Sequence, residues 1–187
     1  WTSETWGSDA LLTLTWLAAR TQRIGLGTGV VQMPGRTPAA AAMAALTLDH
    51  LSGGRLRLGL GVSGPQVAEG WHGVPFDHPL ERTREYVAIV RSVLRRDAPV
   101  TAGGPHYPLP MPGGIGKSLK TNVRPLRAEV PIYLAAMGPR NVRLAAEIAD
   151  GWIPFLYSPE QPALFADALE RGSVQGGARP RPWTSRR

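Results

Sequence analysis

The chain has 187 residues, of which 43% are hydrophobic and 19% are charged, with no cysteine and a formal net charge of +7. This length suffices for one domain with a sizeable core, and the composition is typical of a globular protein. The lack of cysteine excludes disulfides, thiolate nucleophiles and cysteine-based metal sites. No apolar run approaches the roughly 18 residues that a membrane helix needs, and no secretory leader is visible. We therefore expect a cytoplasmic protein with no membrane contact.

The positive charge is concentrated near the C-terminal end of the sequence. No acidic residue follows Glu170, whereas five of the 21 basic residues do, so residues 1–170 carry 16 basic and 14 acidic side chains. This distribution does not form the basic patch that nucleic-acid binding requires, and we expect no nucleic-acid partner. Residues 172–187 lack any hydrophobic period and are predicted to be a basic, disordered tail. Residues 1–171 are then the single domain.

Helical and strand patterns alternate along that domain. Asp9 to Arg20 is predicted to be a helix with Ser8 as its N-cap, and a short strand follows from Ile24 towards Val31. In chain order, the next predictions are a helix over 38–51 capped by Thr37, a strand over 56–62, a loop over 63–78 and a helix over 79–96. An excursion over 98–128 follows, with a short hairpin at 100–109. The last predicted elements are a strand over 131–136, a helix over 139–150, a strand over 151–156 and a helix over 159–171. This order predicts an α/β fold.

Short apolar strands that alternate with helices indicate a parallel sheet with crossover helices. Either a doubly wound sheet or a (β/α)8 barrel fits this pattern, and the pattern alone does not choose between them. Both architectures place functional groups in the loops that follow the carboxyl ends of the strands. Three glycine-containing segments occupy such positions, namely residues 26–32, 59–66 and 135–141.

Each of these segments has a possible binding role and an ordinary structural explanation. Gly27 and Gly29 let the backbone approach a planar ligand, although the G-x-G-x-x-G motif is absent. The Ser63 hydroxyl and nearby main-chain N–H groups are suited to a phosphate, and the helix start beside Arg140 is suited to an anion. The four histidines show no metal-ligand spacing, and G-x-S-x-G is absent, so we predict neither a metal site nor a hydrolase nucleophile.

Taken together, several runs resemble the luciferase-like monooxygenase superfamily over roughly residues 1–165. The matching runs are residues 3–10, 18–30, 47–55, 59–66, 69–73, 82–86 and 146–152. The resemblance is greatest to the branch that uses the deazaflavin coenzyme F420 for hydride transfer. It implies a TIM barrel that is incomplete here, with about five strands present. It also implies a bulge with a non-prolyl cis peptide bond at Gly29–Val30.

The resemblance further implies where a cofactor would bind. Gly29 and Val30 would support the back of the tricyclic ring, Gln32 would lie beside the ring, and Glu4 would reach its polar edge. The phosphate side of the cofactor would be held by four residues around the start of the predicted helix at 139, namely Met137, Gly138, Arg140 and Asn141. Ser63 is the remaining candidate contact. The implied cofactor is F420, with FMN as the alternative.

The implied function is an F420-dependent oxidoreductase that transfers a hydride between reduced deazaflavin and a small organic substrate. Two departures leave the catalytic residues unassigned: Thr5 stands where alcohol and sugar-phosphate dehydrogenases of this branch carry histidine, and Gly64 or Gln66 stands where they carry a carboxylate. The alternatives are an FMN-dependent monooxygenase and an inactive truncated fragment that acts at most as a binding remnant. Full-length relatives are expected to form homo-oligomers.

Overall fold

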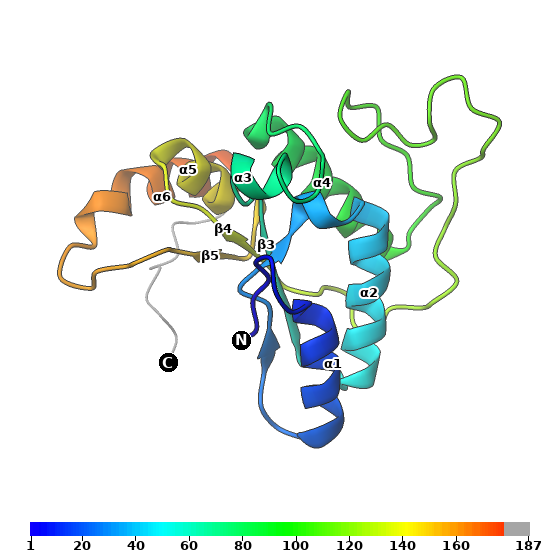
Figure 1. The fold of residues 1–187 in the computed structure, drawn as a ribbon, viewed down its shortest axis with the longest axis horizontal. Coiled ribbons are helices and arrows are strands. Elements are labelled where there is room, and N and C mark those ends of the chain that lie inside the picture. Colours follow the sequence, from blue (N-terminus) through cyan, green and yellow to red (C-terminus); the bar gives the residue numbers. More distant parts are fainter. Residues whose placement is uncertain (178–187) are drawn as a thin grey trace.

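The computed structural model describes residues 1–177, and residues 178–187 lie outside the described part of the chain. Helices and short strands alternate, and the helices form an arc around the strands (Figure 1). The elements are α1 (Ala10–Arg20), β1 (Leu26–Gly27), β2 (Val31–Gln32), the 3-10 turn η1 (Met33–Gly35), α2 (Pro38–Leu51), β3 (Leu56–Gly61), α3 (Pro65–Ala68), α4 (Pro79–Arg95), β4 (Ile132–Ala135), α5 (Pro139–Ile148), β5 (Gly151–Ile153) and α6 (Ala163–Gln175). The predicted α/β class is therefore confirmed.

The strands form one parallel sheet in the order β1-β3-β4-β5, and β2 also pairs with β3. A further parallel bridge joins Thr2 to Thr28, so the N-terminal segment occupies one more strand position beside β1. Counting β1 and β2 as one interrupted strand, the chain contributes five neighbouring positions of a barrel wall. This arrangement confirms the expected partial (β/α)8 barrel and excludes the doubly wound alternative, in which the strand order reverses.

The core lies between β3 and the surrounding helices. Leu56, Leu58 and Leu60 of β3 are fully buried and alternate with Arg57 and the glycines on the opposite face. Alanines of α2, which are also fully buried, let that helix pack closely beside α1 and α4. The small side chains along α2 thus allow close packing with both neighbouring helices.

The local signals for the helices are mostly confirmed. Thr37 caps α2 as predicted, with its hydroxyl accepting from the Ala40 N–H at 3.3 Å. The predicted cap of α1 is wrong by one position, because the carboxylate of Asp9, and not Ser8, accepts from the Leu12 N–H at 2.8 Å. Asp9 reaches the third N–H of the helix from its own extended backbone, which is the usual N-cap geometry.

A one-residue bulge interrupts the strand formed by β1 and β2. Leu26 pairs with Leu56 and Val31 pairs with Leu60, so five steps along the first strand match four steps along β3. The extra residue falls in the segment 28–30. Bulges of this kind re-aim the backbone at the rim of a barrel.

Two glycines of β3 accommodate this bulge. A side chain at Gly59 would overlap the carbonyl oxygen of Thr28, and a Cβ at Gly61 would lie 2.7 Å from Cγ2 of Val30. The buried Thr28 hydroxyl donates to the Gly59 carbonyl and accepts from the Gly59 N–H, both at 2.8 Å. The glycines at 59 and 61 therefore have a packing role, because they admit the bulged backbone into the barrel wall.

The excursion over residues 98–128 has one bridge of its own and is anchored to the barrel by an ion pair. Its predicted hairpin is confirmed as a single antiparallel bridge between Ala102 and Leu109. Near its end, Arg127 donates to both carboxylate oxygens of Asp49, at 3.1 and 2.7 Å, and to the Leu56 carbonyl at 2.6 Å. Asp49 is almost fully buried, so this ion pair fixes the excursion to α2 and to the start of β3.

The C-terminal helix differs from the prediction. α6 begins at Ala163 and runs to Gln175, beyond the expected end of the domain at Arg171. Gly172 and Gly176 face α5 so closely that side chains there would overlap the carbonyl oxygens of Arg143 and Glu147. The helix continues because these small residues allow close packing on α5. The rest of the predicted tail, residues 178–187, is outside the described residues.

Among residues 1–177, no helix combines the length and the apolar character that spanning a membrane would demand.

Candidate functional site

The backbone around the bulge is held between the N-terminal segment and β3. The peptide bond between Gly29 and Val30 is cis, as expected. The Thr2 N–H donates to the Gly27 carbonyl at 2.9 Å, the Gly29 N–H donates to the Thr2 carbonyl at 2.6 Å, and the Glu4 N–H donates to the Val30 carbonyl at 3.1 Å. The backbone of residues 27–30 is therefore positioned from both sides, at the carboxyl end of its strand.

Glu4 and Gln32 are brought together directly beyond the bulge. Oε2 of Glu4 accepts from the Gln32 N–H at 2.9 Å, and Nε2 of Gln32 donates to the Glu4 carbonyl at 3.2 Å. Oε1 of Glu4 accepts from the Arg36 guanidinium at 2.7 Å, and that guanidinium also pairs with Asp9. The Glu4 side chain is only 9% exposed, so its charge is balanced by Arg36 and by the Gln32 N–H. The structure thus assigns Glu4 a bracing role, and its contact with a cofactor stays a prediction.

His72 joins this group from the loop after β3. Its Nε2 lies 3.0 Å from Oε1 of Gln32, and the imidazole also packs against Gly35 of η1. Both ends of the Gln32 amide are therefore engaged, one by the Glu4 carbonyl and the other by His72. This arrangement fixes the amide of a side chain that is 5% exposed.

A second group of predicted residues surrounds the start of α5. Met137, Gly138 and Arg140 are exposed, and Asn141 is half-buried. Gly138 is the N-cap of α5 and makes no side-chain capping hydrogen bond, so the first main-chain N–H groups of the helix point outward. Within residues 1–177, no ion pair involves Arg140. The segment therefore offers a helix N-terminus and an unpaired guanidinium, which together suit an anion.

Ser63 follows β3 at the same edge of the sheet. Its backbone has a φ of 61°, a left-handed conformation that is unusual for a residue other than glycine. Ser63 is half-buried, and none of the hydrogen bonds among the described residues joins it to Gln32 or to the start of α5. The two groups are thus separate parts of one rim, and Ser63 is linked to neither.

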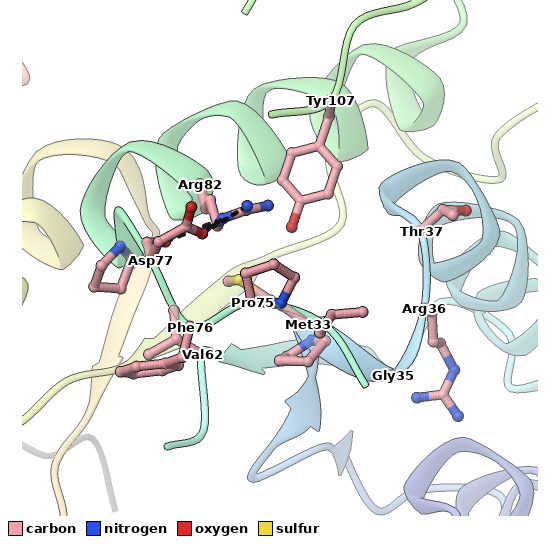
Figure 2. Close-up of a pocket in the computed structure, with 13 residues that line it drawn as sticks. Met33, Gly35, Arg36, Thr37, Val62, Pro75, Phe76, Asp77, Arg82 and Tyr107 are labelled. Carbon is pink, nitrogen blue, oxygen red and sulfur yellow. Dashed lines mark hydrogen bonds and ion pairs between the residues drawn. The ribbon is translucent and has the colours of Figure 1, made fainter. Parts of the chain in front are cut away.

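A cavity of about 310 Å³ lies beside the first group and contains none of the predicted contacts. Figure 2 shows it between η1, the loop over residues 74–77 and the start of α4, with Tyr107 of the excursion above it. Its wall is mainly apolar, with Met33, Pro75 and Phe76 among the lining residues. On the same loop as Pro75 and Phe76, Asp77 accepts a hydrogen bond from Arg82 of α4 at 2.8 Å, which lowers the pKa of the Asp77 carboxyl. Arg36 contributes to both the cavity and the Glu4 cluster.

The sequence profile of the luciferase-like monooxygenase family matches residues 1–186. The chain belongs to the luciferase-like monooxygenase family. It is 58% identical over 182 residues to a protein of Mycobacterium tuberculosis described as a coenzyme F420-dependent oxidoreductase, covering 95% of this chain and 52% of that protein. It is 33% identical over 173 residues to the 5,10-methylenetetrahydromethanopterin reductase of Methanolobus tindarius, covering 92% of this chain and 50% of that protein.

A solved structure supports the same fold. The coenzyme F420-dependent tetrahydromethanopterin reductase from Methanopyrus kandleri superimposes with a TM-score of 0.80 at 24% identity, covering 94% of this chain and 53% of that one. At this identity the likeness establishes the luciferase-like fold alone. The chain spans about half the length of the curated relatives that it matches.

Sequence reasoning missed two residues of this luciferase-like site. Arg36 was not singled out, although it neutralises Glu4, and His72 was not assigned to the site, although it binds Gln32. Arg36 lies four residues after Gln32 in the loop that follows β2, so its position after a strand was a usable signal. His72 lies in the run 69–73 that resembles the family, but its contact with Gln32 depends on the path of the 63–78 loop.

Proposed function

We propose that this chain supplies cofactor-binding strands of an F420-dependent oxidoreductase that transfers a hydride between the reduced deazaflavin and a small organic substrate. The observation that carries the proposal is the bulge at Gly29–Val30, which presents main chain at the carboxyl end of its strand. Similarity to the mycobacterial protein described as F420-dependent supports the choice of cofactor.

The residues present fit a planar ring with an acidic tail. Gly29 has no side chain, and a Cβ there would meet only Trp1, at 3.6 Å, so a flat group can approach the bulge. Gln32 is held in one orientation beside it by Glu4 and His72. The exposed Arg140 at the start of α5 provides positive charge for phosphate. When bound, F420 supplies the hydride carrier, and the protein has to position the ring and the substrate.

The proton chemistry of the site is limited. Thr5 is exposed, and no carboxylate stands at Gly64 or Gln66, so the acid–base pair of related dehydrogenases is missing from these positions. His72 is the titratable side chain bonded to Gln32, and we assign it a positioning role. This set of residues favours a substrate whose reduction needs little proton transfer from the protein.

FMN-dependent monooxygenation is the second candidate function. Flavin and deazaflavin differ at one ring atom, and a ring support made from main chain at Gly29–Val30 does not distinguish them. The family to which the chain belongs is itself described by monooxygenase activity. The cofactor is therefore the property to be measured first.

The test is a titration of the purified full-length protein with F420 and with FMN, each followed by quenching of cofactor fluorescence. We expect F420 to bind more tightly than FMN. Arg140→Ala should weaken F420 binding roughly 10- to 150-fold, because one charge-assisted hydrogen bond is worth about 1.5–3 kcal/mol. Arg23→Ala is the matched control, since it removes an equally exposed arginine from the loop before β1. Tighter binding of FMN would establish the alternative, and binding of neither cofactor would refute both cofactor assignments.

A further inference from the structure

Three side chains with metal-binding atoms converge at the start of α4. His78 is the N-cap residue of the helix, Glu81 lies in its first turn, and His106 comes from the excursion. Nδ1 of His78 is 3.3 Å from Oε2 of Glu81, and Nε2 of His106 is 3.4 Å from the same oxygen. All three ligand atoms lie within 4.8 Å of one another.

These distances match the edges of a metal coordination polyhedron. In a tetrahedral Zn²⁺ site with bonds of about 2.0–2.1 Å, neighbouring ligand atoms are about 3.3–3.4 Å apart. An ordinary N–H···O hydrogen bond is shorter, at about 2.7–3.2 Å. The third distance, between the ligand nitrogens of His78 and His106, reaches this value by rotation of the His78 side chain, which is 59% exposed. Two histidines and one glutamate are an established zinc donor set that leaves one position for water.

His106 is placed for this role by contacts that need no metal. The main-chain N–H groups of His106 and Tyr107 donate to Oε2 of Glu85, at 3.1 and 3.0 Å. The Tyr107 ring packs edge-on against Tyr86 of α4, with ring centroids 5.6 Å apart. The His106 side chain is only 10% exposed and is directed at Glu81. Only His78 and Glu81 therefore need to be ordered on binding, which limits the entropy cost.

We propose that His78, Glu81 and His106 bind Zn²⁺ and that the ion clamps the excursion onto α4. This site is independent of the proposed cofactor function. It lies beside the cavity of about 310 Å³, because Tyr107 follows His106, Pro79 follows His78, and both line that cavity. Figure 2 shows Tyr107 on the side of the cavity formed with α4, opposite Met33 and Val62. A bound ion would therefore lie next to Tyr107, at the edge of this cavity.

Metal binding is tested on the tag-free protein after removal of metal with EDTA. Zn²⁺ is titrated by calorimetry, and Co²⁺ is used as a spectroscopic probe of tetrahedral coordination. We expect one equivalent of Zn²⁺ to bind. His78→Ala, Glu81→Gln and His106→Ala should each weaken binding by about 100-fold or more, since even residues that only support a ligand are worth 10–100-fold. His50→Ala removes a surface histidine of α2 and should leave the affinity unchanged.

A second measurement tests whether bound Zn²⁺ holds the excursion against α4 or binds without restricting it. Lys117 and Lys120 are trypsin targets within the excursion, and both are exposed. Zn²⁺ should slow cleavage there in the wild-type protein and leave cleavage unchanged in His78→Ala, whose exposed side chain makes no core contact. The proposal is overturned if Zn²⁺ does not bind, if binding survives all three substitutions, or if His50→Ala abolishes it equally. Binding without protection would refute the clamp.

Discussion

The bulge at residues 28–30 depends on the absence of a side chain at position 59. In Gly59→Ala the new methyl group would overlap the Thr28 carbonyl oxygen and lie 2.9 Å from Cδ1 of Ile153. The Thr28 carbonyl has no space to withdraw, because Thr28 is fully buried and its backbone is hydrogen-bonded to Arg57 at 3.2 Å. The substitution therefore has to displace the bulge from β3.

The cost follows from two contributions. Overpacking in a core costs about 1–3 kcal/mol. Displacing Thr28 also breaks the two hydrogen bonds between its hydroxyl and Gly59, each worth about 1 kcal/mol. We expect the free energy of unfolding to fall by about 3–5 kcal/mol, which lowers Tm by about 6–20 °C for a chain of this size. Thr28→Val, which removes only the hydrogen bonds, should cost about 2–3 kcal/mol.

The assay is thermal and urea unfolding followed by circular dichroism. Gly103→Ala is the matched control, because a Cβ at Gly103 would have no neighbour within 4 Å. Thr28→Ser is the second control, since it keeps the hydroxyl that pairs with Gly59. If Gly59→Ala unfolded at the same temperature as Gly103→Ala, the packing argument for the bulge would be refuted.

Two ion pairs give further predictions. Arg127→Ala should lower the free energy of unfolding by about 2–4 kcal/mol, because Asp49 would remain buried without its partner, whereas the nearby Arg124→Ala should have little effect in urea unfolding. Glu147 accepts two hydrogen bonds from Arg84, which lower the pKa of its carboxyl below the usual value of 4.5. Since the folded pKa lies below the unfolded one, the stabilisation is present above pH 4.5 and is lost as the pH falls through the folded pKa. The difference in the free energy of unfolding between the wild type and Glu147→Gln should therefore be at most about 1 kcal/mol near neutral pH, because Arg84 is half exposed. This difference should vanish in acid. A difference that stayed constant with pH would contradict the stabilising role of the Arg84–Glu147 ion pair.

Most elements could be predicted from the sequence because their signals are local. The helix over 38–51 has a capping threonine, a proline in its first turn and a glycine pair after its end, and its predicted bounds match the structure. The strand around Leu56–Gly61 was recognisable from its apolar run. The end of α6 was predicted too early, because residues 172–187 lack a hydrophobic period. The glycines at 172 and 176 instead allow close contact with α5.

The candidate site could be predicted only in part. The resemblance placed the bulge at Gly29–Val30, Gln32 beside the cofactor ring and Glu4 at its polar edge. The structure joins Glu4 to Gln32 by hydrogen bonds, and their contacts with a cofactor stay predictions. The roles of Arg36 and His72 escaped prediction, since each depends on a contact with a distant segment of the chain, Arg36 with Glu4 and His72 with Gln32. The glycines of β3, which suggested phosphate binding, are explained by their packing against the bulge.

By itself, the sequence determined the alternation of strands and helices, the family and the position of the bulge, because each depends on residues that are neighbours along the chain. Only the tertiary structure decided which side chains meet at the rim. His72 reaches Gln32 across 40 residues, and His106 reaches Glu81 across 25. Such contacts depend on strand register and on the paths of the loops, and the periodicity of a single segment carries no information about either.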